Sequence, residues 1–198
     1  MTQRKRLLLL IAGFVLLLVA AAMGYTALSQ RGNLSPTGDG SGSQEESTPI
    51  PAPDFQMETG DGTAVTLLET LDGRPAVINF WASTCGPCKT EMPDFQTAFT
   101  SYGEDVQFLM VNVGDAMSGE TREKAEAYLE EEGYTFPVYY DVEYSGVTAY
   151  GLRGFPSTFF LDEDGNVTAY AGGMLTQSML ADGLAMIYPD AAEESQEE

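Results

Sequence analysis

Hydrophobic residues are distributed along this chain in two different ways. Residues 7–23 form one continuous apolar run, and the uncharged stretch extends to residue 28 behind a basic patch at residues 4–6. Beyond residue 54, apolar runs of strand length alternate with longer amphipathic stretches. As a helix, residues 7–28 would extend roughly 33 Å, which is enough to cross the hydrocarbon core of a membrane.

The basic patch predicts the orientation of this N-terminal segment. Lys and Arg flank the cytoplasmic end of a membrane-spanning helix, so the rest of the chain should lie outside the cytoplasm. A cleaved signal peptide is the alternative, because Ala20, Ala21 and Ala22 offer the small residues of a cleavage site. The run is long for a signal peptide, so we predict that residues 1–28 form an uncleaved transmembrane anchor.

Two further segments lack the pattern of a folded domain. Residues 29–53 are rich in Ser, Gly, Pro and Thr, which predicts a flexible linker. Residues 189–198 are strongly acidic and predict a disordered tail. The folded domain is therefore expected at residues 54–188.

Strand and helix patterns alternate through that domain. Two strands around a Gly-Asp-Gly turn are expected within residues 54–67, and dense apolar runs predict buried strands at 75–82 and 106–114. Further along, the expected elements are helices at 85–102, 119–134, 144–152 and 176–187, a short strand at 135–141, and a hairpin at 156–173. This order predicts an α/β fold: a central mixed sheet flanked by helices, with an N-terminal β-hairpin and a short β-α insert.

Charge and composition exclude several classes of function. The net charge is −21, with nine Lys and Arg against thirty Asp and Glu. Such a surface repels phosphate backbones, so we expect no nucleic-acid partner and interpret the acidity as solubility. The chain contains no histidine. Ser-His-Asp triads, Cys-His pairs and His-ligated metals are therefore excluded.

The stretch "NFWASTCGPCKTEMP" at residues 79–93 contains the two cysteines of the chain, Cys85 and Cys88. A tetrahedral metal site needs four ligands, so two cysteines could complete one only in a shared dimer. Haem attachment requires histidine where Lys89 stands. A structural disulfide would close a very small loop and stabilise little. The remaining interpretation is a redox pair at a strand-to-helix junction, and we expect no metal and no cofactor.

Elementary chemistry supports the redox interpretation. Cys85 falls at the expected helix start, where free N–H groups and the helix dipole favour a thiolate, the attacking species in disulfide exchange. Cys88 lies one turn later and can resolve a mixed disulfide. Pro87 has no N–H to lose in a first turn, and Gly86 permits close approach of a partner chain.

Two segments carry a family resemblance. "FWASTCGPCKTEMP" and "LRGFPSTFFLDEDGNV" resemble the active-site segment and the cis-proline loop of the thioredoxin superfamily. The "PDF…DG" opening, "VNVG", "YTFPVYYD" and "GGMLTQSML" extend the similarity to membrane-anchored TlpA/ResA-like thiol-disulfide oxidoreductases. The resemblance spans about residues 50–188 and implies a thioredoxin-like fold.

The resemblance also implies roles for individual residues. Cys85 would be the nucleophile, Cys88 the resolving thiol and Pro156 a cis-proline facing them. Phe155 would offer backbone hydrogen bonds to an extended substrate, with Gly86 and Pro87 beside it. Trp81 is expected beneath the active-site loop, among the residues that shape substrate binding; the alternative is that it only fills the core.

Proton handling is expected to depend on Glu91, three residues after Cys88 and so on the same helical face. A carboxyl beside a buried thiol has a raised pKa and can transfer protons; the alternative is a solvated surface glutamate. Asn79 stands where cytosolic thioredoxins usually carry an aspartate and cannot ionise. Thr84 stands where relatives usually carry Trp, which leaves the substrate range open.

The expected function is an extracytoplasmic thiol-disulfide reductase on a bacterial cell membrane, single-pass, supplied with electrons by a membrane thiol donor. Its substrates would be disulfides of exported proteins, for example in cytochrome c maturation. The alternatives are a thiol oxidase or isomerase, an electron donor to an exported peroxidase or methionine sulfoxide reductase, and a non-catalytic adaptor. A peroxidase of the peroxiredoxin type is disfavoured, because Ile78 and Ala82 replace the proline and threonine of its Pro-x-x-x-Thr-x-x-Cys pattern.

Overall fold

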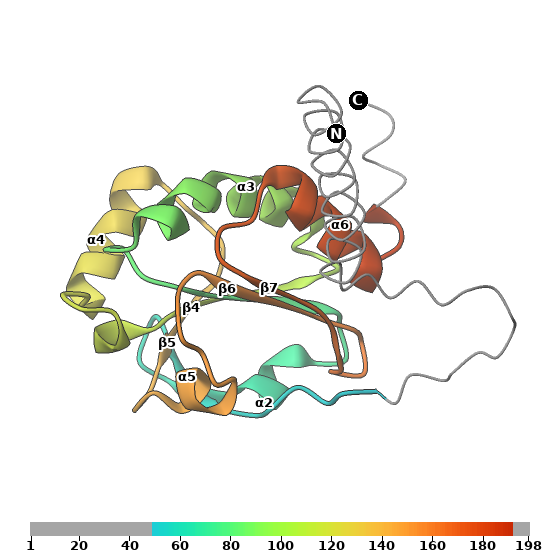
Figure 1. Cartoon of the computed structure of the whole chain (residues 1–198), viewed down its shortest axis with the longest axis horizontal. Helices are drawn as coiled ribbons and strands as arrows, with labels where there is room; N and C mark the ends of the chain where they lie inside the picture. The colour runs from blue at the N-terminus through green and yellow to red at the C-terminus, as the bar shows by residue number, and fades with distance from the viewer. Residues whose placement is uncertain (1–48, 192–198) are drawn as a thin grey trace, which may run out of the picture. The chain divides into compact units, whose positions relative to one another are not determined.

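The computed structural model describes residues 49–191, drawn in colour in Figure 1. The predicted anchor at residues 1–28, most of the predicted linker and most of the acidic tail lie outside these described residues. Within residues 49–191, no helix combines the length and the apolar content needed to cross a membrane.

Seven strands form one mixed sheet in the order β2-β1-β5-β4-β3-β6-β7. The strands are β1 (Gln56–Thr59), β2 (Ala64–Thr66), β3 (Ala76–Trp81), β4 (Gln107–Asn112), β5 (Val138–Asp141), β6 (Ser157–Leu161) and β7 (Val167–Gly172). The pairs β3–β4 and β4–β5 are parallel, and the other neighbours in the sheet are antiparallel. The mixed sheet, the N-terminal hairpin and the β-α insert are as the sequence pattern predicts.

Helices cover both faces of this sheet. They are α2 (Leu67–Leu71), α3 (Gly86–Tyr102), α4 (Arg122–Glu132), α5 (Ser145–Ala149) and α6 (Gln177–Ile187). Figure 1 shows α3, α4 and α6 on one side of the sheet and α2 and α5 on the other. Helix α2 is the element that the hydrophobic pattern misses. Its five residues are too few to show a helical period, yet Thr66 and Glu69 form a complete capping box at its start.

Strand β3 leads directly into the active-site segment, which lies at the carboxyl ends of the parallel strands. All six of its residues are buried, because β4 and β6 flank it and helices cover both faces. Such a strand is a near-continuous run of apolar residues, here Ala-Val-Ile-Asn-Phe-Trp, and the one polar member is Asn79. The strand ends at Trp81, and α3 begins five residues later at Gly86. The two cysteines therefore lie at the carboxyl edge of the parallel core.

The composition predicts that the linker ends at residue 53 and that the folded domain begins at residue 54. In the structure, the folded domain begins a few residues earlier. The Ala52 N–H donates to the Gly165 carbonyl at 2.9 Å, and Val167 N–H donates to the Ile50 carbonyl at 2.8 Å. Ala52 is also buried. Residues 50–52 thus pair with the turn of the β6–β7 hairpin. The two paired segments lie more than a hundred residues apart along the chain.

Gly183 is expected to be intolerant of any side chain. A Cβ at this position of α6 would lie 2.2 Å from Cζ of Phe160, a buried residue of β6. Gly183→Ala should therefore lower the free energy of unfolding by about 1–3 kcal/mol, because overpacking outweighs the better helix propensity of alanine. Urea unfolding measures the change, and Gly60→Ala, which meets nothing within 4 Å, is the control. Equal stability of the two variants would contradict this close packing.

Candidate active site

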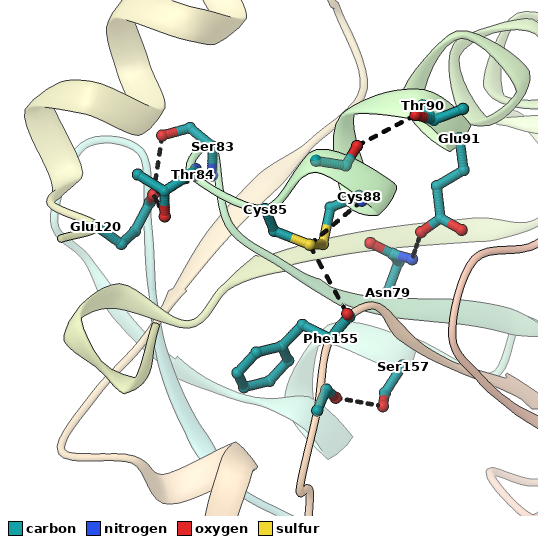
Figure 2. The surroundings of a disulfide bond; sticks show 12 residues. Asn79, Ser83, Thr84, Cys85, Cys88, Thr90, Glu91, Glu120, Phe155 and Ser157 are labelled. Carbon is teal, nitrogen blue, oxygen red and sulfur yellow. Dashed lines mark hydrogen bonds between the residues drawn. A yellow bond between two sulfur atoms is a disulfide. The ribbon is translucent and has the colours of Figure 1, made fainter. Parts of the chain in front are cut away.

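The redox pair occupies the first turn of α3 (Figure 2). Cys85 is the N-cap residue, and its Sγ accepts a hydrogen bond from the Cys88 N–H at 3.3 Å. The two sulfur atoms are bonded at 2.16 Å, so this is the oxidised form. Cys85 is 3% exposed and Cys88 is 0% exposed. The thiol at the helix start is therefore the one that a substrate can reach, as expected for the nucleophile.

The loop before β6 faces this pair. The Phe155–Pro156 peptide bond is cis, as the family resemblance implies. The carbonyl oxygen of Phe155 lies 3.7 Å from Cys85 Sγ, and Figure 2 shows it directed at the disulfide. Gly86 and Pro87, the two residues between the cysteines, are exposed. The structure thus brings together four residues that the sequence predicted around the pair.

Trp81 is the predicted site residue that needs correction. Its side chain is fully buried, and its ring centroid lies 6.2 Å from that of Tyr128 on α4. An indole without exposed surface has nothing to offer a substrate, so Trp81 is a core residue below the active-site segment and not a substrate-binding one. Both faces of β3 are buried, as its continuous apolar run predicts, so the indole at its last residue packs against α4 and stays inside the protein.

Glu91 lies inside the protein and not on the helix surface. It is 1% exposed and accepts hydrogen bonds from the Leu175 backbone N–H at 2.7 Å and from Asn79 Nδ2 at 2.8 Å. Burial raises the pKa of Glu91 from its ordinary 4.5 to about 7, although the two donors lower it and the charge of Asp94 raises it. A carboxyl with a pKa near neutrality can both accept and return a proton.

Asn79 connects this carboxyl to the next strand. Its Nδ2 also donates to Oγ1 of Thr158 on β6 at 3.0 Å, while its Oδ1 has no hydrogen-bond partner among the described residues. The amide holds Glu91 without adding a second negative charge. Asn79 cannot ionise, so Glu91 is the titratable group of this pair, and its part in proton transfer stays a prediction.

Glu120 is a site residue that the sequence analysis missed. It precedes α4, is 2% exposed, and accepts hydrogen bonds from both Ser83 and Thr84, the residues that lead into Cys85. Burial raises the pKa of Glu120, but the donors of Ser83, Asn112 and Thr84 outweigh it and the net shift is downward. The sequence contains thirty acidic residues, and nothing close to Glu120 in the sequence marks it as a partner of Ser83 and Thr84, which lie 37 and 36 residues away.

A shallow pocket adjoins the cis-proline loop. Its lining includes Tyr150, Arg153, Phe155 and Tyr170. The pocket could receive a side chain of a substrate whose backbone lies along Phe155. Within residues 49–191, no three His, Cys, Asp or Glu side chains are placed to hold a metal ion.

Comparison with known proteins agrees with this geometry. Residues 50–170 match the family model described as the AhpC/TSA family. The chain is 31% identical over 188 residues to the thiol-disulfide oxidoreductase ResA of Geobacillus thermodenitrificans, covering 94% of this chain and all of the relative. It is 29% identical to ResA of Bacillus subtilis, covering 94% and 97% of the two chains. The chain belongs to the AhpC/TSA family. Within it, the chain is a thiol-disulfide oxidoreductase of the ResA type.

A solved structure supports the same assignment for the fold. StoA from Bacillus subtilis superimposes with a TM-score of 0.57 at 25% identity, covering 68% of this chain and 98% of StoA. For a ResA-like enzyme, the family resemblance predicts as working parts the Cys85–Cys88 pair, the loop at Phe155–Pro156 and Glu91, which is buried. Thr84 departs from the usual tryptophan; it is exposed, and its hydroxyl donates to Glu120 at 3.0 Å.

Proposed function

We propose that this protein is an extracytoplasmic, membrane-anchored thiol-disulfide reductase of exported proteins. The observation that carries the proposal is the reachable Cys85 beside the Phe155 carbonyl, with Cys88 fully buried behind it. An extended substrate segment could pair with the backbone at Phe155 and present its disulfide to Cys85. The apolar run at residues 7–23 behind a basic patch supports export and anchoring.

The chemistry proceeds by two successive thiol-disulfide exchanges. The Cys85 thiolate attacks one sulfur of the substrate disulfide, forms a mixed disulfide and releases the other substrate sulfur as a thiolate, which takes up a proton. Cys88 then loses its proton and attacks Cys85 Sγ, which releases the second substrate thiolate and leaves the Cys85–Cys88 disulfide. Two electrons have passed to the substrate, and a membrane thiol donor would return the enzyme to its dithiol form. Glu91 is the internal group that can take the Cys88 proton.

The reduction potential of the Cys85–Cys88 pair tests the direction of this reaction. A reductase should have a potential close to that of thioredoxin, about −270 mV, whereas an oxidase such as DsbA lies near −120 mV. The measurement equilibrates the purified protein with glutathione or dithiothreitol buffers and quantifies the dithiol. A value near the oxidase end would replace the proposal by the oxidase or isomerase function.

The substrate class is a separate part of the proposal. Disulfides of apocytochromes c are one candidate, and exported peroxidases or methionine sulfoxide reductases that need electrons are another. Both present a disulfide in an exported protein, so both fit the same site. Loss of cytochrome c in a strain that lacks this protein, restored by the full chain, would favour the first.

A further inference from the structure

Five hydrogen bonds converge on the carboxylate of Glu120. Its Oε1 accepts from Ser83 N and from Asn112 Nδ2, each at 2.9 Å. Its Oε2 accepts from Thr84 N at 2.9 Å and from the hydroxyls of Ser83 and Thr84 at 2.9 Å and 3.0 Å. Figure 2 shows the carboxylate facing these two residues. A solvated surface glutamate would not accept five hydrogen bonds from protein donors, so the Glu120 side chain is held in one fixed position.

The donors belong to the segment that positions the nucleophile. Ser83 and Thr84 join the end of β3 to Cys85, and Asn112 closes β4 opposite Trp81. Glu120 therefore ties the carboxyl ends of two parallel strands to the two residues immediately before the reactive sulfur. The Cys85 N–H donates to the Ala82 carbonyl at 3.2 Å, which closes the same short turn.

No cation among residues 49–191 forms an ion pair with this buried charge. Among residues 49–191, the two ion pairs both belong to Arg122, which contacts Glu58 at 3.1 Å and Glu126 at 2.9 Å. Lys124 donates to the backbone carbonyl of Gly119, and Lys89 Nζ lies 4.6 Å from the ring centroid of Tyr128. Glu120 is thus held as a carboxylate by hydrogen bonds alone, and its downward pKa shift keeps it ionised at neutral pH. A full negative charge remains next to the active-site segment.

We propose that Glu120 is a positioning residue of the redox pair, and that its fixed negative charge makes the Cys85–Cys88 dithiol a stronger reductant. A nearby negative charge disfavours the Cys85 thiolate, whereas the disulfide carries no charge to be disfavoured. A dithiol that gains less stabilisation from its thiolate gives up its electrons more readily, which makes the potential more negative. The inference goes beyond the proposed function, since it concerns how the protein sets this value and not which substrate it reduces.

The site requires a carboxylate and not an amide. In Glu120→Gln, the amide NH2 must replace either Oε1 or Oε2. At the first position it would face the Ser83 N–H, and at the second the Thr84 N–H, and neither backbone donor can turn into an acceptor. The hydroxyls of Ser83 and Thr84 can rotate to accept. Glutamine therefore keeps most of the shape of the site, loses one backbone contact and removes the charge.

The test measures the equilibrium constant for reduction of the full-length protein by glutathione. In this reaction two glutathione thiols and the Cys85–Cys88 disulfide give the dithiol and one glutathione disulfide. We expect Glu120→Gln to shift the constant about tenfold toward the dithiol, equivalent to about 30 mV, and to lower the Cys85 thiol pKa. Glu130→Gln removes a carboxylate from an exposed position of α4 and should leave both unchanged.

Two further variants separate the charge from the hydrogen bonds. Ser83→Ala combined with Thr84→Val removes both hydroxyl donors and keeps the carboxylate, so it should lose thermal stability with an unchanged equilibrium constant. Glu120→Asp keeps the charge on a shorter side chain, and its equilibrium constant should remain within about twofold of the wild-type value. This variant also keeps the test possible if Glu120→Gln does not fold. A destabilised Glu120→Gln with an unchanged constant, or a tenfold shift in Glu120→Asp, would overturn the inference. Because these readings are differences from wild type, they are independent of whether the wild-type potential is that of a reductase.

Discussion

Cys88→Ser is expected to accumulate as a covalent complex with its substrate, whereas Cys85→Ser is expected to lose disulfide exchange altogether. The reason is the difference in access between the two sulfur atoms, since Cys85 reaches the surface and Cys88 does not. Without the Cys88 thiol, a mixed disulfide on Cys85 has no internal thiol to resolve it. Without the Cys85 thiol no mixed disulfide forms, and the exchange rate should fall by about 10³-fold or more.

Non-reducing gel electrophoresis followed by mass spectrometry measures the first outcome, and a disulfide-reduction assay measures the second. The chain offers a clean design, because it contains no cysteine besides these two. A trapped partner of Cys88→Ser must therefore be attached through Cys85, and the double variant Cys85→Ser with Cys88→Ser should trap nothing. Partners trapped by Cys85→Ser at comparable yield would show that the roles of the two thiols are reversed.

The parts of this site that lie close together in the sequence are those that the sequence predicts. Cys85, Cys88 and Glu91 fall within two turns of one helix, so their spacing already places them on one face. The succession of strands along the chain follows equally well from the alternating apolar runs, since each run is long enough to show its own pattern. Local sequence therefore accounts for the nucleophile, the resolving thiol and the acid behind them.

Contacts between distant segments are the parts that the sequence does not reveal. Glu120 meets Ser83 and Thr84 only because the turn before α4 folds back over the end of β3. Residues 50–52 belong to the segment 29–53, which predicts a linker because it is rich in Ser, Gly, Pro and Thr, yet backbone pairing with residues 165–167 needs no particular side chain. The pairing of residues 50–52 uses backbone groups, and two of the five donors to Glu120 are backbone N–H groups, which leave no trace in the residue pattern. The other three donors are side chains of Ser83, Thr84 and Asn112, residue types too common to mark a site.

Glu91→Gln is expected to make the oxidised protein more stable at pH 8 while slowing its reaction. The wild-type carboxyl has a pKa of about 7 in the folded protein, against an ordinary value of 4.5. Between pH 4.5 and pH 7 the carboxyl is protonated in the folded state and ionised in the unfolded state. The contribution of Glu91 to the free energy of unfolding therefore falls as pH rises from about 4.5 to 7 and is then constant. The difference between the two pKa values corresponds to about 3 kcal/mol in the free energy of unfolding, which the wild type has lost above pH 7.

Glutamine can occupy the site without this cost. Its Oε1 can accept from the Leu175 N–H as the carboxylate does, and its NH2 can donate to the Oδ1 of Asn79, which otherwise lacks a partner among the described residues, once that amide rotates. Urea unfolding of the oxidised proteins between pH 5 and pH 8 should show a slope for wild type and for Glu130→Gln, and a much flatter profile for Glu91→Gln. Parallel profiles for all three would show that Glu91 titrates with an ordinary pKa.

The reaction should respond in the opposite direction from the stability. If Glu91 accepts the Cys88 proton, its loss removes general base catalysis from the resolving step, an effect on the order of 10²-fold. Stopped-flow measurement of mixed-disulfide resolution between pH 6 and pH 8 should show the wild-type rate rising through about pH 7 and the Glu91→Gln rate remaining low. Titration of the Cys88 thiol in both proteins completes the test. A variant that is more stable but equally fast would confine Glu91 to the packing behind α3, because a proton carrier cannot be removed without changing the rate of the step it serves.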